Sequence, residues 1–197
     1  DGLIPYIADR EWAKESGEDF DYELSGIRSL MFQARHLDRF IASGLSKDDW
    51  IRAAEFIQLK ITDEVIEKAV RNMPDEIYLL SGKTIEQKLK TRVKKLNKYA
   101  QQYYLMIAEE VDIVGSTKRE YFDITRNKDN SVTIKMYPAK KGQADTSNLI
   151  FNRTFYPDET KEIRVFGLDG KDVFVVSGEC DESILVRLIG GPGRDTF

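Results

Sequence analysis

Two aspartates that follow pairs of glycines are the residues of this 197-residue sequence best suited to bind an ion. Asp172 ends the segment Gly-Leu-Asp-Gly-Lys-Asp, and Asp195 ends the segment Gly-Gly-Pro-Gly-Arg-Asp. The second segment fits the Gly-Gly-x-Gly-x-Asp turn of calcium-binding β-rolls, in which carboxylates and backbone carbonyls bind the ion. The pattern therefore suggests calcium as a cofactor, with Asp172 and Asp195 as metal ligands.

The spacing of the two turns favours an alternative without metal. Calcium rolls repeat about every nine residues, so that carboxylates of neighbouring turns converge on one ion. Here Asp172 and Asp195 are much further apart than one such repeat, and each turn stands alone in the sequence. Glycines can supply the backbone angles of such a turn while the aspartate caps it through a side-chain oxygen.

Both turns belong to a longer repeat, which extends over 163–174 and again over 186–197. The shared pattern is apolar-Arg-apolar-apolar-Gly-x-x-Gly-x-Asp-x-Phe. Repeats of this period indicate stacked supersecondary units, and they predict that Phe174 and Phe197 lie in one row of side chains. The last unit then has an open edge that favours pairing with another chain.

The sequence lacks the common catalytic motifs. It contains no Gly-x-Ser-x-Gly, no Walker loop, no His-Glu-x-x-His and no Cys-x-x-Cys. The single histidine, His36, falls in a helical pattern and is expected at a surface or interface. The single cysteine, Cys180, is expected to be a passive exposed thiol. We therefore predict no catalytic residue and no cofactor-binding residue other than the two aspartates.

The first part of the chain is expected to be helical. Residues 1–23 form an acidic lead-in, and residues 24–114 carry apolar side chains at three- and four-residue steps. Ser46 and Thr62 stand where helix N-caps are expected. The longest apolar series runs from Ile85 to Val111, and Gly115 is expected to end that helix.

The second part, 115–197, has the two-residue period of strands. A hairpin is expected from 121–126 and 132–137, followed by strands near 148–156, 161–166, 172–177 and 183–189. The sequence therefore predicts an α+β fold, with an N-terminal helical block followed by an antiparallel β-rich block with Gly/Asp-turn repeats.

Charge and composition narrow the classes of partner. The net charge of −4 argues against nucleic acid as a partner, and the apolar runs are too short to span a membrane. Because the sequence lacks a starting methionine, it is expected to be an excised or processed fragment. The basic stretch 83–98 could contact anionic lipid or polysaccharide, or form the solvated side of a helix. Trp12, Trp50 and Tyr103-Tyr104 could line a sugar site, although core positions are the simpler interpretation.

Several phrases together resemble a region of large Bacteroidota-type envelope proteins, of the metallophosphoesterase and surface-antigen outer-membrane kinds. The phrases are Leu45–Trp50, Ile61–Val70, Val111–Ser116, Arg153–Phe155 and Thr160–Asp172. In that family the region lies between an upstream catalytic or kinase-like part and a C-terminal β-barrel. The phosphoesterase motifs Asp-x-His, Gly-Asp-x-x-Asp and Gly-Asn-His are absent from this sequence, so the resemblance transfers no catalytic residue.

The resemblance implies a non-catalytic structural or interaction module of a cell-envelope protein, periplasmic or outer-membrane-associated. The expected partners are neighbouring domains of the parent protein, another envelope protein or a glycan. One alternative is a fragment of an envelope phosphoesterase or kinase-like enzyme whose catalytic part lies upstream, with the acidic lead-in and the helical block as one wall of its site. Another alternative is a glycan-binding module that uses exposed aromatic side chains.

Overall fold

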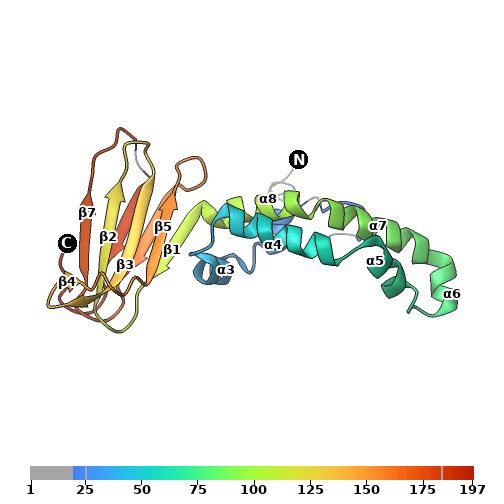
Figure 1. Cartoon of the computed structure of the whole chain (residues 1–197), viewed down its shortest axis with the longest axis horizontal. Coiled ribbons are helices and arrows are strands. Elements are labelled where there is room, and N and C mark those ends of the chain that lie inside the picture. The colour runs from blue at the N-terminus through green and yellow to red at the C-terminus, as the bar shows by residue number, and fades with distance from the viewer. Residues whose placement is uncertain (1–19, 25, 183) are drawn as a thin grey trace, which may run out of the picture. The chain divides into compact units, whose positions relative to one another are not determined.

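The computed structural model describes residues 20–24, 26–182 and 184–197, and these form two compact units (Figure 1). The helical unit comprises residues up to 35 together with 46–106, and the β unit comprises 36–45 and 107–197. Helices come first and strands second, which confirms the predicted α+β class. The chain passes between the units three times, after residues 35, 45 and 106.

Short helices build the helical unit. They are α2 (Ile27–Met31), α4 (Lys47–Lys60), α5 (Asp63–Val70), α6 (Asp75–Ile77), the π-helical turn η1 (Tyr78–Gly82), α7 (Lys83–Lys94) and α8 (Leu96–Ala108). The predicted caps are confirmed. Ser46 and Asp49 form a reciprocal capping box, and the Thr62 hydroxyl accepts the N–H of Val65 at 3.4 Å.

The core of this unit forms where α5, η1 and α7 meet. Ile66, Val70 and Tyr78 are buried there, with Ile85 and Leu89 packed against them. The Tyr78 hydroxyl donates to Glu86 at 2.8 Å, and Lys83 lies 2.9 Å from the same carboxylate. Lys83 and then Tyr78 lower the pKa of Glu86 against the opposing effect of burial, and its side chain is 3% exposed.

The prediction of one long helix from Ile85 to Val111 is wrong. α7 ends at Lys94, Lys95 leaves the helical region with φ −96° and ψ 4°, and α8 ends at Ala108. Val111 lies instead in strand β1 (Glu110–Val114), whose backbone pairs with β6 (Glu162–Phe166). A side-chain period cannot reveal a partner strand that is distant in the sequence, so pairing decided the structure here.

The β unit contains helix α3 (Arg35–Ala42, whose first residue falls in the helical unit) and two sheets (Figure 1). One sheet has the order β1-β6-β8, with β8 at Leu185–Ile189, and all its strands are parallel. The other has the order β4-β3-β2-β7, with β5 also paired to β3. Its strands are β2 (Glu120–Arg126), β3 (Val132–Lys140), β4 (Gln143–Ala144), β5 (Phe151–Phe155) and β7 (Val173–Ser177). The predicted antiparallel pairing holds for β2 to β5, whereas β2 and β7 are parallel.

The two sequence repeats stack on each other in register. Strand β6 pairs with β8 so that Ile163 faces Val186, and isolated bridges join Gly170 to Gly193 and Val173 to Thr196. Every one of these pairs joins equivalent positions of the two copies, so the offset between partners equals the period of the repeat. The predicted stack is therefore confirmed, and we call 162–174 coil 2 and 185–197 coil 3.

A third copy, which the sequence analysis missed, lies beneath coil 2. Residues 110–122, called coil 1, pair with coil 2 at a constant offset through β1–β6 and β2–β7. The hairpin of β2 and β3, with β5 alongside, fills the extra length between coils 1 and 2. The stack therefore has three coils, of which the first carries a long insertion.

A row of phenylalanines runs through the three coils. The rings of Phe122 and Phe174 are parallel with centroids 4.8 Å apart, and those of Phe174 and Phe197 are 5.0 Å apart. This confirms the predicted row. Phe122 and Phe174 are 0% and 2% exposed, within a core that also contains Ile113, Ile163 and Val165.

Close approach between coils requires glycine. A Cβ on Gly193 would lie 2.1 Å from the Gly170 carbonyl oxygen, and a Cβ on Gly170 would lie 2.2 Å from that of Lys118. Both glycines have φ +143°, which L side chains rarely adopt. The glycines of the repeat therefore set the distance between coils as well as the turn.

Gly193→Ala should lower the free energy of unfolding by about 2 kcal/mol or more, because the added methyl group meets backbone at an unfavourable φ. Urea unfolding measures the change. Gly44→Ala is the matched control, since its Cβ would only reach ordinary contact with Phe151 at 3.8 Å. Equal loss of stability in the two variants would contradict the close packing of coils.

Candidate functional site

The acidic residues of the three coils form a ladder of turn caps. Asp172 Oδ1 accepts the backbone N–H of Glu120 at 2.8 Å, and Asp195 Oδ1 accepts the N–H of Asp172 at 3.0 Å. The carboxylate of each later coil thus binds the backbone of the coil before it. In coil 1 the Glu120 carboxylate caps its own turn through the N–H and hydroxyl of Ser116.

Glycine makes room for each of these carboxylates. A Cβ on Gly167 would lie 2.5 Å from Asp172 Oδ2, and a Cβ on Gly190 would lie 2.2 Å from Asp195 Oδ2. Gly115 occupies the same place in coil 1, 3.0 Å from Glu120 Oε2 by the same measure. The first glycine of each coil is therefore part of the cap.

Asp172 is the most enclosed member of the ladder. Its side chain is 1% exposed, and its Oδ2 has no hydrogen-bond partner among the described residues. Burial raises the pKa of Asp172 above the ordinary aspartate value. The Glu120 N–H opposes this shift, whereas the carboxylates of Glu120 and Asp195 reinforce it.

The structure brings the two predicted calcium ligands together, but in the roles of the metal-free alternative. Asp172 and Asp195 belong to adjacent coils and each uses Oδ1 to bind a backbone N–H. Within the described ranges, no three His, Cys, Asp or Glu side chains are grouped to hold a metal ion. Calcium binding by these residues stays a prediction.

Sequence reasoning missed the contribution of coil 1. Gly115, Glu120 and Phe122 stand where coil 2 has Gly167, Asp172 and Phe174. Residues 111–122 carry the signal. They have the pattern apolar-x-apolar-apolar-Gly, followed by an acid and a Phe at the spacing of the other two copies. Glutamate in place of aspartate, Lys118 at the second glycine position and the inserted hairpin concealed it.

Charged side chains also pair between coils, on the side of the β1-β6-β8 sheet that faces away from the core. Arg164 of β6 lies 2.6 Å from Asp112 of β1, and Arg187 of β8 lies 2.6 Å from Glu162 of β6. Arg39 of α3 joins the row through Glu110 at 2.9 Å. Opposite charges on neighbouring strands therefore favour this register.

The outer side of coil 3 lacks the contacts that coils 1 and 2 receive. The core-facing Val186 and Leu188 of β8 are only partly buried, whereas their equivalents in coil 2, Ile163 and Val165, are 0% exposed. Phe197 is 72% exposed. The β1-β6-β8 sheet ends at β8 among the described strands. This surface, formed by β8, Asp195 and Phe197, is the feature of the β unit best suited to bind another polypeptide.

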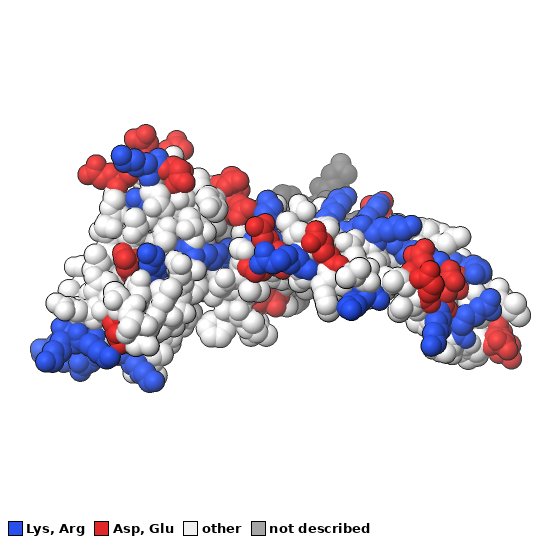
Figure 2. Space-filling view, in the orientation of Figure 1, with Lys and Arg blue, Asp and Glu red and all other residues white. Residues whose placement is uncertain are grey.

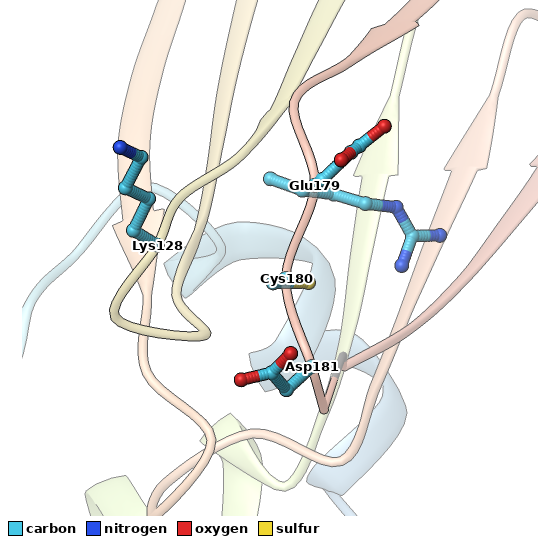
Figure 3. A pocket seen from close by; sticks show the side chains of 5 residues that line it. Lys128, Glu179, Cys180 and Asp181 are labelled. Atoms are coloured by element: carbon cyan, nitrogen blue, oxygen red, sulfur yellow. The ribbon is translucent and has the colours of Figure 1, made fainter.

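A hollow of about 580 Å³ lies between the β2–β3 turn and the loop after β7 (Figure 3). Its lining is Arg126, Lys128, Glu179, Cys180 and Asp181. In Figure 3 the Glu179 carboxylate points away from the Asp181 carboxylate, and Lys128 extends from a separate loop. Cys180 is a free, partly exposed thiol. The labelled side chains do not converge on one point, so the hollow offers no ready catalytic arrangement.

Trp50 and Tyr103 lie in an apolar pocket of about 280 Å³ within the helical unit. Their rings meet edge to face, at 87° with centroids 5.2 Å apart, so this pair forms no flat platform for a sugar. Tyr104 is buried at 3% exposure, and Trp12 lies outside the described residues. His36 is exposed on α3, as expected.

The basic stretch 83–98 and the described part of the acidic lead-in pair with each other. Lys88 lies 3.6 Å from Asp21, and Lys95 pairs with Glu23. Lys90 lies 2.5 Å from Glu67 of α5. Figure 2 shows both signs of charge interspersed over the helices. The described acids are therefore spread along the basic stretch, and the rest of the lead-in, 1–19, lies outside the described residues.

Comparison with known proteins finds no family model, curated protein or solved structure that matches this chain. The resemblance to envelope proteins therefore stays a prediction. Among the described helices, none has the length and apolar character needed to cross a bilayer.

Asp172→Asn should change how stability depends on pH. The folded protein holds the Asp172 proton more tightly than the unfolded chain, so ionisation costs stability once the pH exceeds the unfolded value of about 3.9. The cost becomes complete above the raised pKa of the folded state. Asparagine keeps an oxygen for the Glu120 N–H, so the variant should gain stability relative to the unchanged protein as pH rises from about 4 to 8. Urea unfolding at several pH values measures this difference.

Asp145→Asn is the matched control, with the opposite sign. Lys140, Ser147 and Asn148 lower the pKa of Asp145, so its ionised form stabilises the fold above the ordinary aspartate pKa and loses this effect as pH falls. The control variant should therefore lose stability relative to the unchanged protein as pH rises. Parallel curves for Asp172→Asn and the unchanged protein would show that Asp172 carries no burial cost.

Calcium binding has its own test. If Asp172 and Asp195 bind the ion with backbone carbonyls, millimolar calcium should raise the melting temperature. Asp195→Ala should abolish this increase. Equal melting curves of the unchanged protein in calcium and in chelator would establish the metal-free capped turn.

Proposed function

We propose that this chain is a non-catalytic structural and interaction module of a larger bacterial cell-envelope protein, periplasmic or outer-membrane-associated. The observation that carries the interaction role is the parallel stack of coils 1 to 3, with β8 and Phe197 exposed at its end. A strand edge with exposed apolar side chains readily pairs with another polypeptide. The envelope location is supported by the resemblance of its phrases to envelope proteins.

The residues of the repeat are used for packing between coils. Phe122 and Phe174 are buried in the shared core, and Asp172 and Asp195 bind backbone N–H groups. Glycines lie against the carboxylates, where a Cβ would collide with them. This arrangement supports a role in assembly, with neighbouring domains of the parent protein as the first partners.

Cell fractionation tests the proposal. An antibody raised against this chain should detect, in cells that carry the gene, a band larger than 22.7 kDa in the envelope fraction. A band of 22.7 kDa confined to the soluble cytosolic fraction would contradict both the larger parent and the envelope location.

A chromosomal Phe174→Asp variant tests whether the stack is needed. The substitution buries a carboxylate between two rings, which costs several kcal/mol by the usual order of magnitude, so the envelope band should be lost or much reduced. Phe56→Asp is the matched control, because Phe56 on α4 is 61% exposed and its replacement should leave the band unchanged. A full-strength envelope band with Phe174→Asp would show that assembly does not depend on the coils.

A further inference from the structure

Three contacts recur at each step of the stack. The N–H of the first glycine donates to a carbonyl of the next coil, as Gly115 does to Phe166 at 2.7 Å and Gly167 to Ile189 at 2.8 Å. The N–H of the acidic residue donates to the carboxylate of the next coil, as described for Glu120 and Asp172. The phenylalanine stacks on that of the next coil.

On coil 3 the two corresponding N–H groups and the outer face of the phenylalanine ring have no partner in the described part of the chain. The N–H groups of Gly190 and Asp195 donate no hydrogen bond to any described residue. One face of the Phe197 ring packs on Phe174, and the side chain is 72% exposed. Among the described strands, β8 pairs with β6 along one edge and with none along the other.

We propose that this outer face of coil 3 is a docking surface for one further parallel polypeptide coil with the same repeat chemistry. The incoming segment supplies a strand for β8, a carbonyl for the Gly190 N–H, a carboxylate for the Asp195 N–H and an aromatic ring for Phe197. It also carries a glycine opposite Gly193, because coils approach too closely there for a Cβ. The required pattern is apolar-x-apolar-apolar-Gly-x-x-Gly-x-Asp-x-Phe. This inference deepens the proposed interaction role and rests on it.

A second copy of this chain does not meet these requirements through its own coil 3. Its Asp195 Oδ1 already accepts the N–H of Asp172, and its Gly190 and Asp195 present donors rather than acceptors. Two such edges brought together would leave these donors facing each other, which costs hydrogen bonds on both sides. A segment that approaches with a free carboxylate satisfies all positions at once.

The experiment adds a second copy of residues 175–197 directly after Phe197. The added copy places an aspartate and a phenylalanine one repeat period beyond Asp195 and Phe197, in the register of the stack. Amide hydrogen exchange should slow by at least about tenfold at both Asp195 and Gly190, because each N–H gains an acceptor. The free energy of unfolding of the extended protein should also rise.

The matched control is the same extension with its copies of Asp195 and Phe197 both replaced by alanine. It has the same length and leaves every residue of the original chain unchanged, and the Asp195 amide should exchange as fast as in the original protein. The proposal would be overturned if the Asp195 amide exchanged at the same rate in the two extended proteins. It would also be overturned if the unaltered extension left that rate as it is in the original protein. A second copy would be the occupant instead if sedimentation showed that the unextended protein dimerises and hydrogen exchange showed that the dimer protects the Asp195 amide. That result would also overturn the proposal. The cell-fractionation result is independent, so failure here is distinguishable from failure of the proposed envelope role.

Discussion

The β unit depends on the contact in which a carboxylate of one coil accepts a backbone N–H of the coil before it. Asp172 bridges coils 1 and 2 in this way, and Asp195 bridges coils 2 and 3. The contact forms only because Gly167 and Gly190 have no Cβ where the second carboxylate oxygen lies. One geometric requirement thus fixes the turn, the spacing of the coils and the register of the strands on either side. The stacked rings of Phe122, Phe174 and Phe197 follow from that register.

This contact has a cost at the centre of the stack. Asp172 is enclosed between coils, and one of its oxygens has no partner among the described residues. A buried carboxylate is tolerated when it binds backbone N–H groups, and the Glu120 N–H provides one such bond. Asp172 therefore keeps this hydrogen bond at a buried position that disfavours its ionised form, and burial raises its pKa. Asp172 therefore contributes to the geometry of the stack although its carboxylate is poorly solvated.

Different kinds of contact stabilise the two units. In the β unit, apolar side chains fill a core between the sheets, and ion pairs such as Arg164–Asp112 line the other side of one sheet. In the helical unit the apolar clusters are smaller and many contacts are charged, including Lys90 with Glu67 and Lys83 with Glu86. The repeated contact surface belongs to the β unit, so the proposed association with another polypeptide involves that unit.

The sequence by itself determined the local features. Short-range signals indicated the caps at Ser46 and Thr62, the β2–β3 hairpin and the repeated turn segments with their row of phenylalanines. Only the tertiary structure decided that Val111 leaves the helical series for strand β1, and that residues 110–122 form the first coil. It also decided that Asp172 and Asp195 face backbone N–H groups. The physical reason is that capping and periodicity act within a few residues, whereas the pairing of β1 with β6 and the enclosure of Asp172 depend on segments that are far apart in the chain.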